Sequence, residues 1–596
     1  MPLVTYDAQG NLTNLIDAKG NTTSYSYDIR NKIAKQTYSD GSSKIFAYDA
    51  NGLLISRTTG NGIQTQYKYD KLNRLTERQY PGNISDLFSY DAAGRMLTAI
   101  NTNATVSFEY DAPGRVTKEN LNGVSTTYTY SIANRTKTIN YPGGMQILWQ
   151  ADKRERLIGI NEGGNSLVTF QYNINDQLVN KQYRNTTSTD YTYDSMGNLT
   201  SLVSIPNTIL NMNYQYDNSD NRTVTQRINK PAFSEQYTYD KLFQLSSFKS
   251  GQYANGVLTP TGTQEFSYDA LGNRISTSEN QLNKTYTVNN VNQYTSILTN
   301  GSNDPPAYDL TGNITSDGLN SYTYDTENRL LSIQNNTGTI TYKYDALGRR
   351  ISREKNGTVK LYFYSQNEVI EERVNSAIKS FIYGAGIDNI LFAKTTTASY
   401  FYHTDDLNSV HALTDASGTL IEYYTYDPFG NPHVFNAANV ELTTSSINNL
   451  LFTGREYDFD YKVYNYRSRD MNPSLGRFAQ RDPLEYVDGL NNYAYVNNNV
   501  INNTDPLGLV RVWGVVGAVG GIIGNGIGFA GSVIFGVVTS PTVGGAAVGV
   551  AGAGYFGYGV FANAENLAAA WADEDPLSTG GALGDGAKEF FPCNET

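Results

Sequence analysis

Tyr90-Asp91-Ala92-Ala93-Gly94-Arg95 is the stretch that decides the fold, because versions of it recur along most of the chain. An Asp in this position opens a type I turn, and a Gly three residues later closes it. Tyrosines two positions apart, such as Tyr67 and Tyr69, place their rings on the same face of a strand. The unit is therefore predicted to be strand, turn, strand.

The spacing of the tyrosines indicates a repeat array. A unit of 20 or 21 residues fits one β-hairpin, which is only marginally stable alone and must pair with its neighbours. Tyr-Asp returns less regularly as far as Tyr344, and no sustained helical periodicity precedes residue 510. We expect an all-β chain in which these hairpins build one long, continuous, curved sheet. The first tyrosines of the array are Tyr6, Tyr27, Tyr48, Tyr69, Tyr90, Tyr110 and Tyr130.

Composition excludes several classes of function. The 596 residues include 57 Asp and Glu against 45 Lys and Arg, a formal charge of -12. Direct binding of nucleic acid is therefore not expected, because it needs clustered cations. Cys593 is the single cysteine, so no intrachain disulfide or cysteine-rich zinc site is expected. The first five residues lead straight into the first repeat, without a visible signal peptide.

The C-terminal tail has a different composition from the repeats. Residues 512–564 contain no Asp, Glu, Lys or Arg, and 16 of these 53 residues are glycine. Residues 512–540 and 543–564 are each long enough to span a bilayer as a helix. Glycines at every fourth position form a stripe that lets membrane helices approach closely. The sequence predicts a membrane-inserting helical hairpin packed through Gly520, Gly524, Gly528, Gly545 and Gly549.

Two other interpretations of the tail stay open. In the first, the tail is a membrane-passage module from which a separate active segment was lost. In the second, it is a degenerate remnant. The polar end, residues 565–596, has no His and only Cys593, so no hydrolytic or metal-dependent active site is visible there.

The Tyr-Asp-x-x-Gly-Arg pattern resembles the YD repeat of the rearrangement hotspot (RHS) family. That family includes bacterial polymorphic toxins and the cocoon-forming components of insecticidal toxin complexes, and teneurins carry related repeats. The resemblance covers residues 1–509, and its sharpest motifs resemble the RHS-associated core. These motifs are Tyr402-His403-Thr404-Asp405, Ala412-Leu413-Thr414-Asp415, Tyr426-Asp427-Pro428-Phe429-Gly430-Asn431, Tyr466-Arg467-Ser468-Arg469, Gly476-Arg477-Phe478, Arg481-Asp482-Pro483, Tyr493-Ala494-Tyr495-Val496 and Asp505-Pro506-Leu507-Gly508-Leu509.

The resemblance implies a spiralling β-shell that encloses its own C-terminal segment as cargo and cuts itself once, here between Leu509 and Val510. It divides the chain into a repeat shell (1–365), a core (366–509) and a variable cargo segment (510–596). It also implies secretion or delivery to target cells, a secretion machinery and an immunity protein. A second shell chain with earlier repeats is a further expected partner, and no cofactor is expected.

Asp482 and Asp505 are the candidate catalytic residues. Two carboxylates that share one proton can act as base toward water and as acid toward the amide. The resemblance assigns Arg469 as the cation that orients a carboxylate. The alternative interpretation is that both aspartates have only a structural role, because Asp-Pro turns are common in proteins. The first motif departs from the family pattern, with Glu485 where Gly is usual, and a side chain there is expected to alter the turn beside Asp482.

Weaker candidates are interpreted structurally. His403 beside Asp405 and Asp406 is expected to make loop contacts rather than bind a metal. Gly526-x-Gly528-x-x-Gly531 matches a dinucleotide fingerprint but lacks the strand–helix setting and the later acidic residue. The alternative function is a non-enzymatic cell-surface or adhesion protein whose tyrosines bind glycans or a partner cell. Alternate tyrosines more often pack between repeats.

Overall fold

The computed structural model describes residues 3–280 and 282–513 and confirms the all-β prediction. In the first sheet, 29 strands pair antiparallel in the order of the chain. These strands are β1 (Leu3–Tyr6), β2 (Leu12–Ile16), β3 (Thr22–Tyr27), β4 (Ile33–Thr37), β5 (Ser43–Tyr48), β6 (Leu54–Thr58), β7 (Gln64–Tyr69), β8 (Leu75–Tyr80), β9 (Ile84–Tyr90), β10 (Met96–Ile100), β11 (Thr105–Tyr110), β12 (Val116–Leu121), β13 (Val124–Ser131), β14 (Thr136–Asn140), β15 (Gln146–Ala151), β16 (Leu157–Glu162), β17 (Asn165–Tyr172), β18 (Leu178–Tyr183), β19 (Ser188–Tyr193), β20 (Leu199–Ile205), β21 (Asn211–Tyr216), β22 (Arg222–Arg227), β23 (Ser234–Tyr239), β24 (Leu245–Ala254), β25 (Val257–Tyr268), β26 (Arg274–Glu279), β27 (Leu282–Val288), β28 (Tyr294–Thr299) and β29 (Ser302–Asn303).

A second sheet of 15 strands continues the array. One continuous sheet was therefore the wrong expectation. Pro305 and Pro306 lie between β29 and β30, and proline cannot donate to a strand ladder. The strands are β30 (Ala307–Tyr308), β31 (Ile314–Ser316), β32 (Ser321–Tyr324), β33 (Leu330–Asn335), β34 (Gly338–Tyr344), β35 (Arg350–Lys355), β36 (Thr358–Ser365), β37 (Glu368–Val374), β38 (Ala377–Tyr383), β39 (Ile390–Thr395), β40 (Ser399–Thr404), β41 (Val410–Thr414), β42 (Leu420–Tyr426), β43 (Pro432–Asn436) and β44 (Glu441–Leu442).

The remaining elements are short. A four-stranded sheet holds β45 (Glu456–Asp458), β46 (Val463–Tyr466), β47 (Arg469–Asn472) and β48 (Arg477–Phe478). A two-stranded sheet holds β49 (Asn503–Thr504) and β50 (Val512–Trp513). The 3-10 helices are η1 (Pro231–Phe233), η2 (Phe452–Gly454), η3 (Glu485–Asp488) and η4 (Val496–Asn498).

Each part of the Tyr-Asp-x-x-Gly-Arg motif has a defined contact, as the repeat at Tyr90 illustrates. The Tyr90 hydroxyl donates to the Leu75 carbonyl of the previous strand at 2.9 Å. Asp91 accepts the backbone N–H groups of Ala93 and Arg95, both at 2.9 Å. Gly94 takes φ 84°, a left-handed conformation that glycine adopts without steric cost, and donates its N–H to the Asp91 carbonyl. In this repeat the motif therefore ties the turn to the strand before it.

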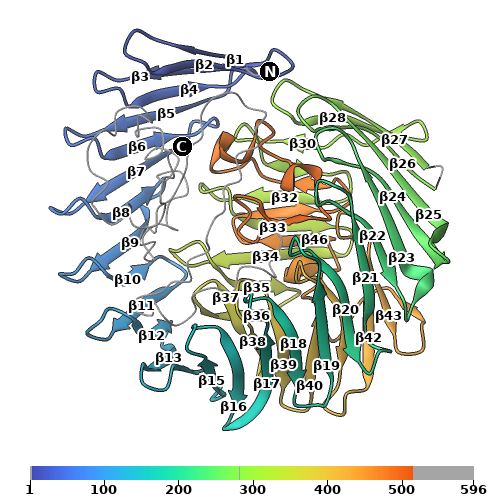
Figure 1. Cartoon of the computed structure of the whole chain (residues 1–596). Coiled ribbons are helices and arrows are strands. Elements are labelled where there is room, and N and C mark those ends of the chain that lie inside the picture. Colours follow the sequence, from blue (N-terminus) through green and yellow to red (C-terminus); the bar gives the residue numbers. More distant parts are fainter. Residues whose placement is uncertain (1–2, 281, 514–596) are drawn as a thin grey trace, which may run out of the picture.

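The first sheet curves through almost a complete circuit. Figure 1 shows its strands descending one side, crossing the bottom and rising on the other side, which brings β1 close to β28. Polar contacts join the ends of this circuit. Lys19 pairs with Asp269 at 2.8 Å, and the Ser39 hydroxyl donates to the Asn290 carbonyl at 2.6 Å. The β-hairpin array is thus strongly curved, as predicted.

The second sheet packs against the first, so the chain spirals. The Tyr183 hydroxyl donates to the Tyr402 carbonyl at 2.7 Å, and Arg57 pairs with Glu327 at 3.0 Å. The sequence separation across these contacts falls from 270 residues for Arg57 to 219 for Tyr183. The spiral therefore tightens between these two contacts, and β46, near the end of the described residues, lies inside the circuit (Figure 1).

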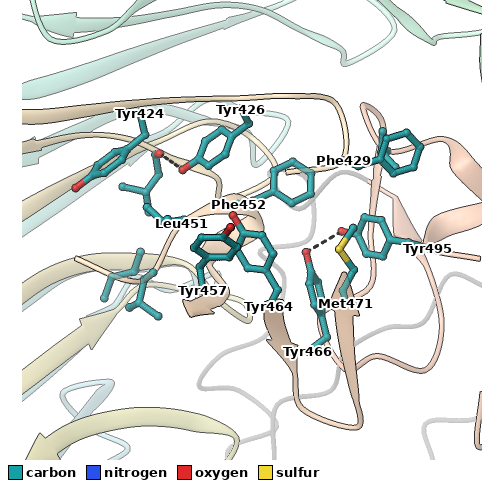
Figure 2. Close-up of a cluster of buried hydrophobic side chains, with 14 of the residues drawn as sticks. Tyr424, Tyr426, Phe429, Leu451, Phe452, Tyr457, Tyr464, Tyr466, Met471 and Tyr495 are labelled. Carbon is teal, nitrogen blue, oxygen red and sulfur yellow. Dashed lines mark hydrogen bonds between the residues drawn. The ribbon is translucent and has the colours of Figure 1, made fainter. Parts of the chain in front are cut away.

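An aromatic cluster holds this central segment in place (Figure 2). Tyr464, Tyr466 and Met471 are fully buried in it, and the Tyr466 hydroxyl donates to that of Tyr495 at 3.2 Å. The cluster also includes Phe452. It fixes the hairpin of β46 and β47, from which Arg469 projects.

Two sequence-based assignments are not settled by the fold. The boundary between residues 365 and 366 falls in the turn between β36 and β37, inside one sheet, and stays a prediction. The tail glycines Gly520, Gly524, Gly528, Gly545 and Gly549 lie outside the described residues. Within residues 3–280 and 282–513, no helix is both long and apolar enough for a bilayer crossing.

Candidate functional site

Arg469 brings the two candidate carboxylates together. Its Nη2 lies 3.0 Å from Asp482 Oδ2 and 3.1 Å from Asp505 Oδ2. All three side chains are at most 5% exposed. The sequence placed these residues up to 36 positions apart, and the structure makes them one buried cluster. Their catalytic roles stay a prediction.

Local structure explains how each of the three is positioned. Arg469 begins β47, and its guanidinium lies 3.7 Å from the centre of the Phe478 ring in the aromatic cluster. Asp482 precedes a proline and accepts the Leu484 N–H at 2.8 Å. Asp505 opens a turn that Gly508 closes with φ 66°. A Cβ on Gly508 would lie 2.6 Å from the Tyr466 carbonyl oxygen, so only glycine fits there.

The peptide between Leu509 and Val510 lies directly on this cluster. Asp505 Oδ1 accepts the N–H of Leu509 at 2.9 Å and that of Val510 at 3.1 Å. On the upstream side, Arg469 Nε donates to the Gly508 carbonyl at 2.6 Å. The backbone is therefore held by Asp505 and by Arg469, whose Nη2 also pairs with Asp482.

Burial sets the protonation of the cluster. It raises the pKa of Asp482 to about 8, although the Arg469 charge acts in the opposite direction. Burial also raises the pKa of Asp505, opposed by Arg469 and by the N–H groups of Leu509 and Val510. Burial therefore favours the protonated form of Asp482, whereas the N–H donors around Asp505 oppose its protonation.

Two residues of this site were missed by sequence reasoning. Asp488 accepts the Arg511 N–H at 3.2 Å and so holds the backbone beyond Val510. The Asn492 carbonyl accepts both the Asp482 N–H at 2.9 Å and Arg469 Nη1 at 3.3 Å. Arg511, the last cation before the charge-free segment, was the only sequence signal for an acidic partner.

Glu485 occupies the position where the first Asp-Pro motif departs from the family pattern. Its φ is 56°, in the left-handed region that favours glycine. The Asp482 turn is nevertheless intact, because the Glu485 N–H donates to the Asp482 carbonyl at 3.1 Å. The expectation that a side chain at this position alters the turn beside Asp482 stays a prediction, and the motif retains its hydrogen bond.

The histidines make structural contacts. His403 is buried, its Nε2 lies 3.0 Å from the Thr414 hydroxyl, and burial beside Lys181 lowers its pKa to about 3. Asp406 pairs with Arg222, and Asp405 lies 3.2 Å from His411 Nε2. Among the described residues, no group of three or more His, Cys, Asp and Glu is placed to hold a metal ion.

Comparison with known families decides the family. The Teneurin YD-shell model matches residues 85–225 and 206–506, and the RHS Repeat model matches residues 6–43 and 48–84. The chain belongs to the RHS-repeat, YD-shell family. The part of this YD-shell protein before Leu509, which includes Arg469, Asp482 and Asp505, thus lies almost wholly within the matched residues.

Relatives of this YD-shell protein include toxins. It is 35% identical over 265 residues to the tRNA3(Ser)-specific nuclease WapA of Bacillus spizizenii, across 43% of this chain and 11% of the nuclease. It is 26% identical over 452 residues to toxin subunit YenC2 of Yersinia entomophaga, across 66% of this chain and 41% of the subunit. The chain therefore spans less than half the length of either relative.

Solved structures show the same fold. The TcdB2-TccC3 structure superposes with a TM-score of 0.71 at 18% identity, across 85% of this chain and 30% of that one. At this identity the likeness establishes the β-shell fold and nothing more.

Proposed function

We propose that this YD-shell protein is a toxin carrier that encloses the segment after Leu509 and severs it by one cut between Leu509 and Val510. The observation that carries the proposal is the placement of that peptide on a buried pair of carboxylates bridged by Arg469. The names of the relatives, a tRNA-specific nuclease for WapA and a toxin subunit for YenC2, support the class of protein.

The proposed chemistry is hydrolysis with two aspartates in different protonation states. Ionised Asp505 takes a proton from a water molecule whose oxygen attacks the Leu509 carbonyl carbon, while protonated Asp482 supplies a proton to the carbonyl oxygen. Asp505 Oδ1 lies 3.1 Å from the Val510 nitrogen, so it can pass its proton to that nitrogen as the C–N bond breaks. One hydroxyl proton of the resulting diol returns to Asp482 as the C–N bond breaks. The products are the Leu509 carboxylic acid, which ionises in water, and a free amine on Val510.

Arg469 has two roles in this scheme. It holds both carboxylates with one nitrogen, Nη2, and fixes the Gly508 carbonyl with another, Nε. A planar guanidinium with several donors suits this task, whereas the single ammonium of lysine does not. The reaction happens once per chain, because the leaving segment is part of the same polypeptide.

The cargo proposed here is membrane-active. The charge-free residues 512–564 and their glycine stripe support a hairpin that inserts into lipid after release. A shell around an apolar peptide has a physical purpose, because the free peptide would aggregate in water. Delivery to target cells, a secretion machinery, an immunity protein and a second shell chain are part of the proposal.

Retention of the cut segment tests the carrier role. Purified protein is passed over a size-exclusion column and the shell peak is then denatured. We expect two fragments, 1–509 and 510–596, to elute together and to separate only after denaturation. Elution of the C-terminal fragment apart from the shell would contradict encapsulation, and a single full-length chain would contradict the cut.

A further inference from the structure

Glu485 makes contacts that the proposed chemistry does not use. Its backbone is in the left-handed region, with φ 56°, where a side chain costs conformational energy that glycine would avoid. Glu485 is only partly buried, but both of its carboxylate oxygens accept hydrogen bonds. A residue retained in an unfavourable conformation points to compensating side-chain contacts.

The first contacts of Glu485 reach the start of the chain. The Tyr38 hydroxyl donates to Oε1 at 2.6 Å, and the Lys44 ammonium pairs with the same oxygen. The neighbouring Tyr486 hydroxyl lies 2.8 Å from that of Thr23. These partners belong to the first repeats, more than 440 positions earlier. Burial opposes ionisation, but Lys44 and Arg481 hold the pKa of Glu485 below its ordinary value.

The other Glu485 oxygen reaches the cleavage site. Asn492 Nδ2 donates to Oε2 at 3.2 Å. The carbonyl of the same asparagine accepts Arg469 Nη1 and the Asp482 N–H. One side chain, Asn492, therefore separates the Glu485 carboxylate from the groups that hold the carboxylate pair.

We propose that Glu485 is a positioning residue that makes self-cleavage depend on docking of the first repeats against the core. The inference rests on the proposed function and names its regulation. When Tyr38 and Lys44 are in place, Glu485 fixes Asn492, which fixes Arg469 and Asp482. Before the N-terminal repeats close, the loop lacks these partners and the chain is cut slowly. The cargo is thus severed only after the shell around it is closed.

The test follows the rate of cutting in full-length chains during cell-free synthesis. Tyr38→Phe and Lys44→Met remove the partners on the repeat side and leave every residue of the carboxylate pair unchanged. We expect the double variant to be cut at least tenfold more slowly than wild type. The single variant Lys44→Arg keeps both the charge and Tyr38, so it should be cut at nearly the wild-type rate.

Glu327→Gln is the matched control. Glu327 pairs with Arg57 at 3.0 Å, which likewise joins the first circuit to the second, at a different place from Glu485. We expect this variant to be cut at the wild-type rate. Equal slowing by Glu327→Gln and by Lys44→Met would mean that any loosening of the shell delays cutting, and would overturn the inference.

Further arms separate failure of this inference from failure of the proposed function. Asp482→Asn should abolish cutting, and persistent cutting there would contradict the function itself. Suppose that Asp482→Asn stays uncut while Tyr38→Phe, Lys44→Met and their double variant are all cut at the wild-type rate. That result would overturn only the role of Glu485. Folding of each variant is checked by thermal unfolding in the uncut Asp482→Asn background, and Tyr38→Phe alone, which loses one hydroxyl, should fold and still be cut more slowly.

Discussion

At the residue scale, the cleavage site depends on one guanidinium shared by two buried carboxylates. Both Asp-Pro motifs and Arg469 were identifiable from the sequence through their resemblance to a family pattern. Asp488 and Asn492 were not, because an isolated Asp or Asn in a loop carries no signal until the fold shows what its atoms face. The left-handed backbone of Glu485 was equally invisible, since its sequence position suggested only a departure from Gly.

The pH dependence of cutting follows from Asp482. Its pKa is about 8, so the carboxyl donates a proton below pH 8 and loses that ability above it. We expect the rate of cutting in freshly synthesised chains to fall about tenfold per pH unit above pH 8. The fraction cut is measured on denaturing gels after dilution into buffers from pH 6 to pH 10.

Asp488→Asn is the control for this pH profile, because burial raises the Asp488 pKa only to about 6. The fall above pH 8 should persist in this variant. A flat profile between pH 7 and pH 10 in the wild type would contradict the assignment of Asp482 as the proton donor.

At the scale of the elements, tyrosine hydroxyls link neighbouring hairpins by hydrogen bonds. The prediction of strand, turn, strand succeeded because the Asp and Gly of the motif encode the turn locally. The sequence could not show that the second tyrosine of a pair bonds a carbonyl of the previous repeat, as Tyr69 does with Leu54 at 2.9 Å. A hydroxyl that donates to a backbone carbonyl of the sheet is not free to donate to a sugar. This bonding therefore weakens the glycan-binding interpretation.

Removal of one such hydroxyl should weaken a single repeat. Tyr90→Phe loses the bond to the Leu75 carbonyl and should lower the free energy of local opening by about 1 kcal/mol. Hydrogen–deuterium exchange in β8 and β9 should accelerate about fivefold, since exchange follows local opening. Tyr6→Phe, on an exposed strand where the ring is 59% exposed, is the control and should change little. Unchanged exchange in Tyr90→Phe would contradict this linking role.

At the scale of the whole molecule, the chain coils so that its start and its core meet. Curvature was predictable from the repeat period, but the closure between Lys19 and Asp269 was not. Nearly identical turns recur throughout the chain, so the local sequence does not show which two turns come into contact after one circuit. The break at Pro305 and Pro306 was visible in the sequence, yet its effect on a continuous ladder emerges only when strands are paired.

The released segment should act on lipid if the cargo proposal is correct. Residues 510–596 are expected to release dye from liposomes, and Gly524→Asp should suppress release because a charge in a packed membrane interface is costly. Gly524→Ala keeps a small side chain and serves as the control, with release expected near the wild-type level. Equal release by all three would argue against a packed glycine stripe.

The most direct test of the central claim is the denatured intact mass of freshly purified protein, wild type beside Asp482→Asn. We predict two wild-type fragments that meet at Leu509 and Val510, and a single uncut chain for the variant. One full-length mass in both samples, or a cut in both, would contradict self-cleavage by the carboxylate pair on Arg469.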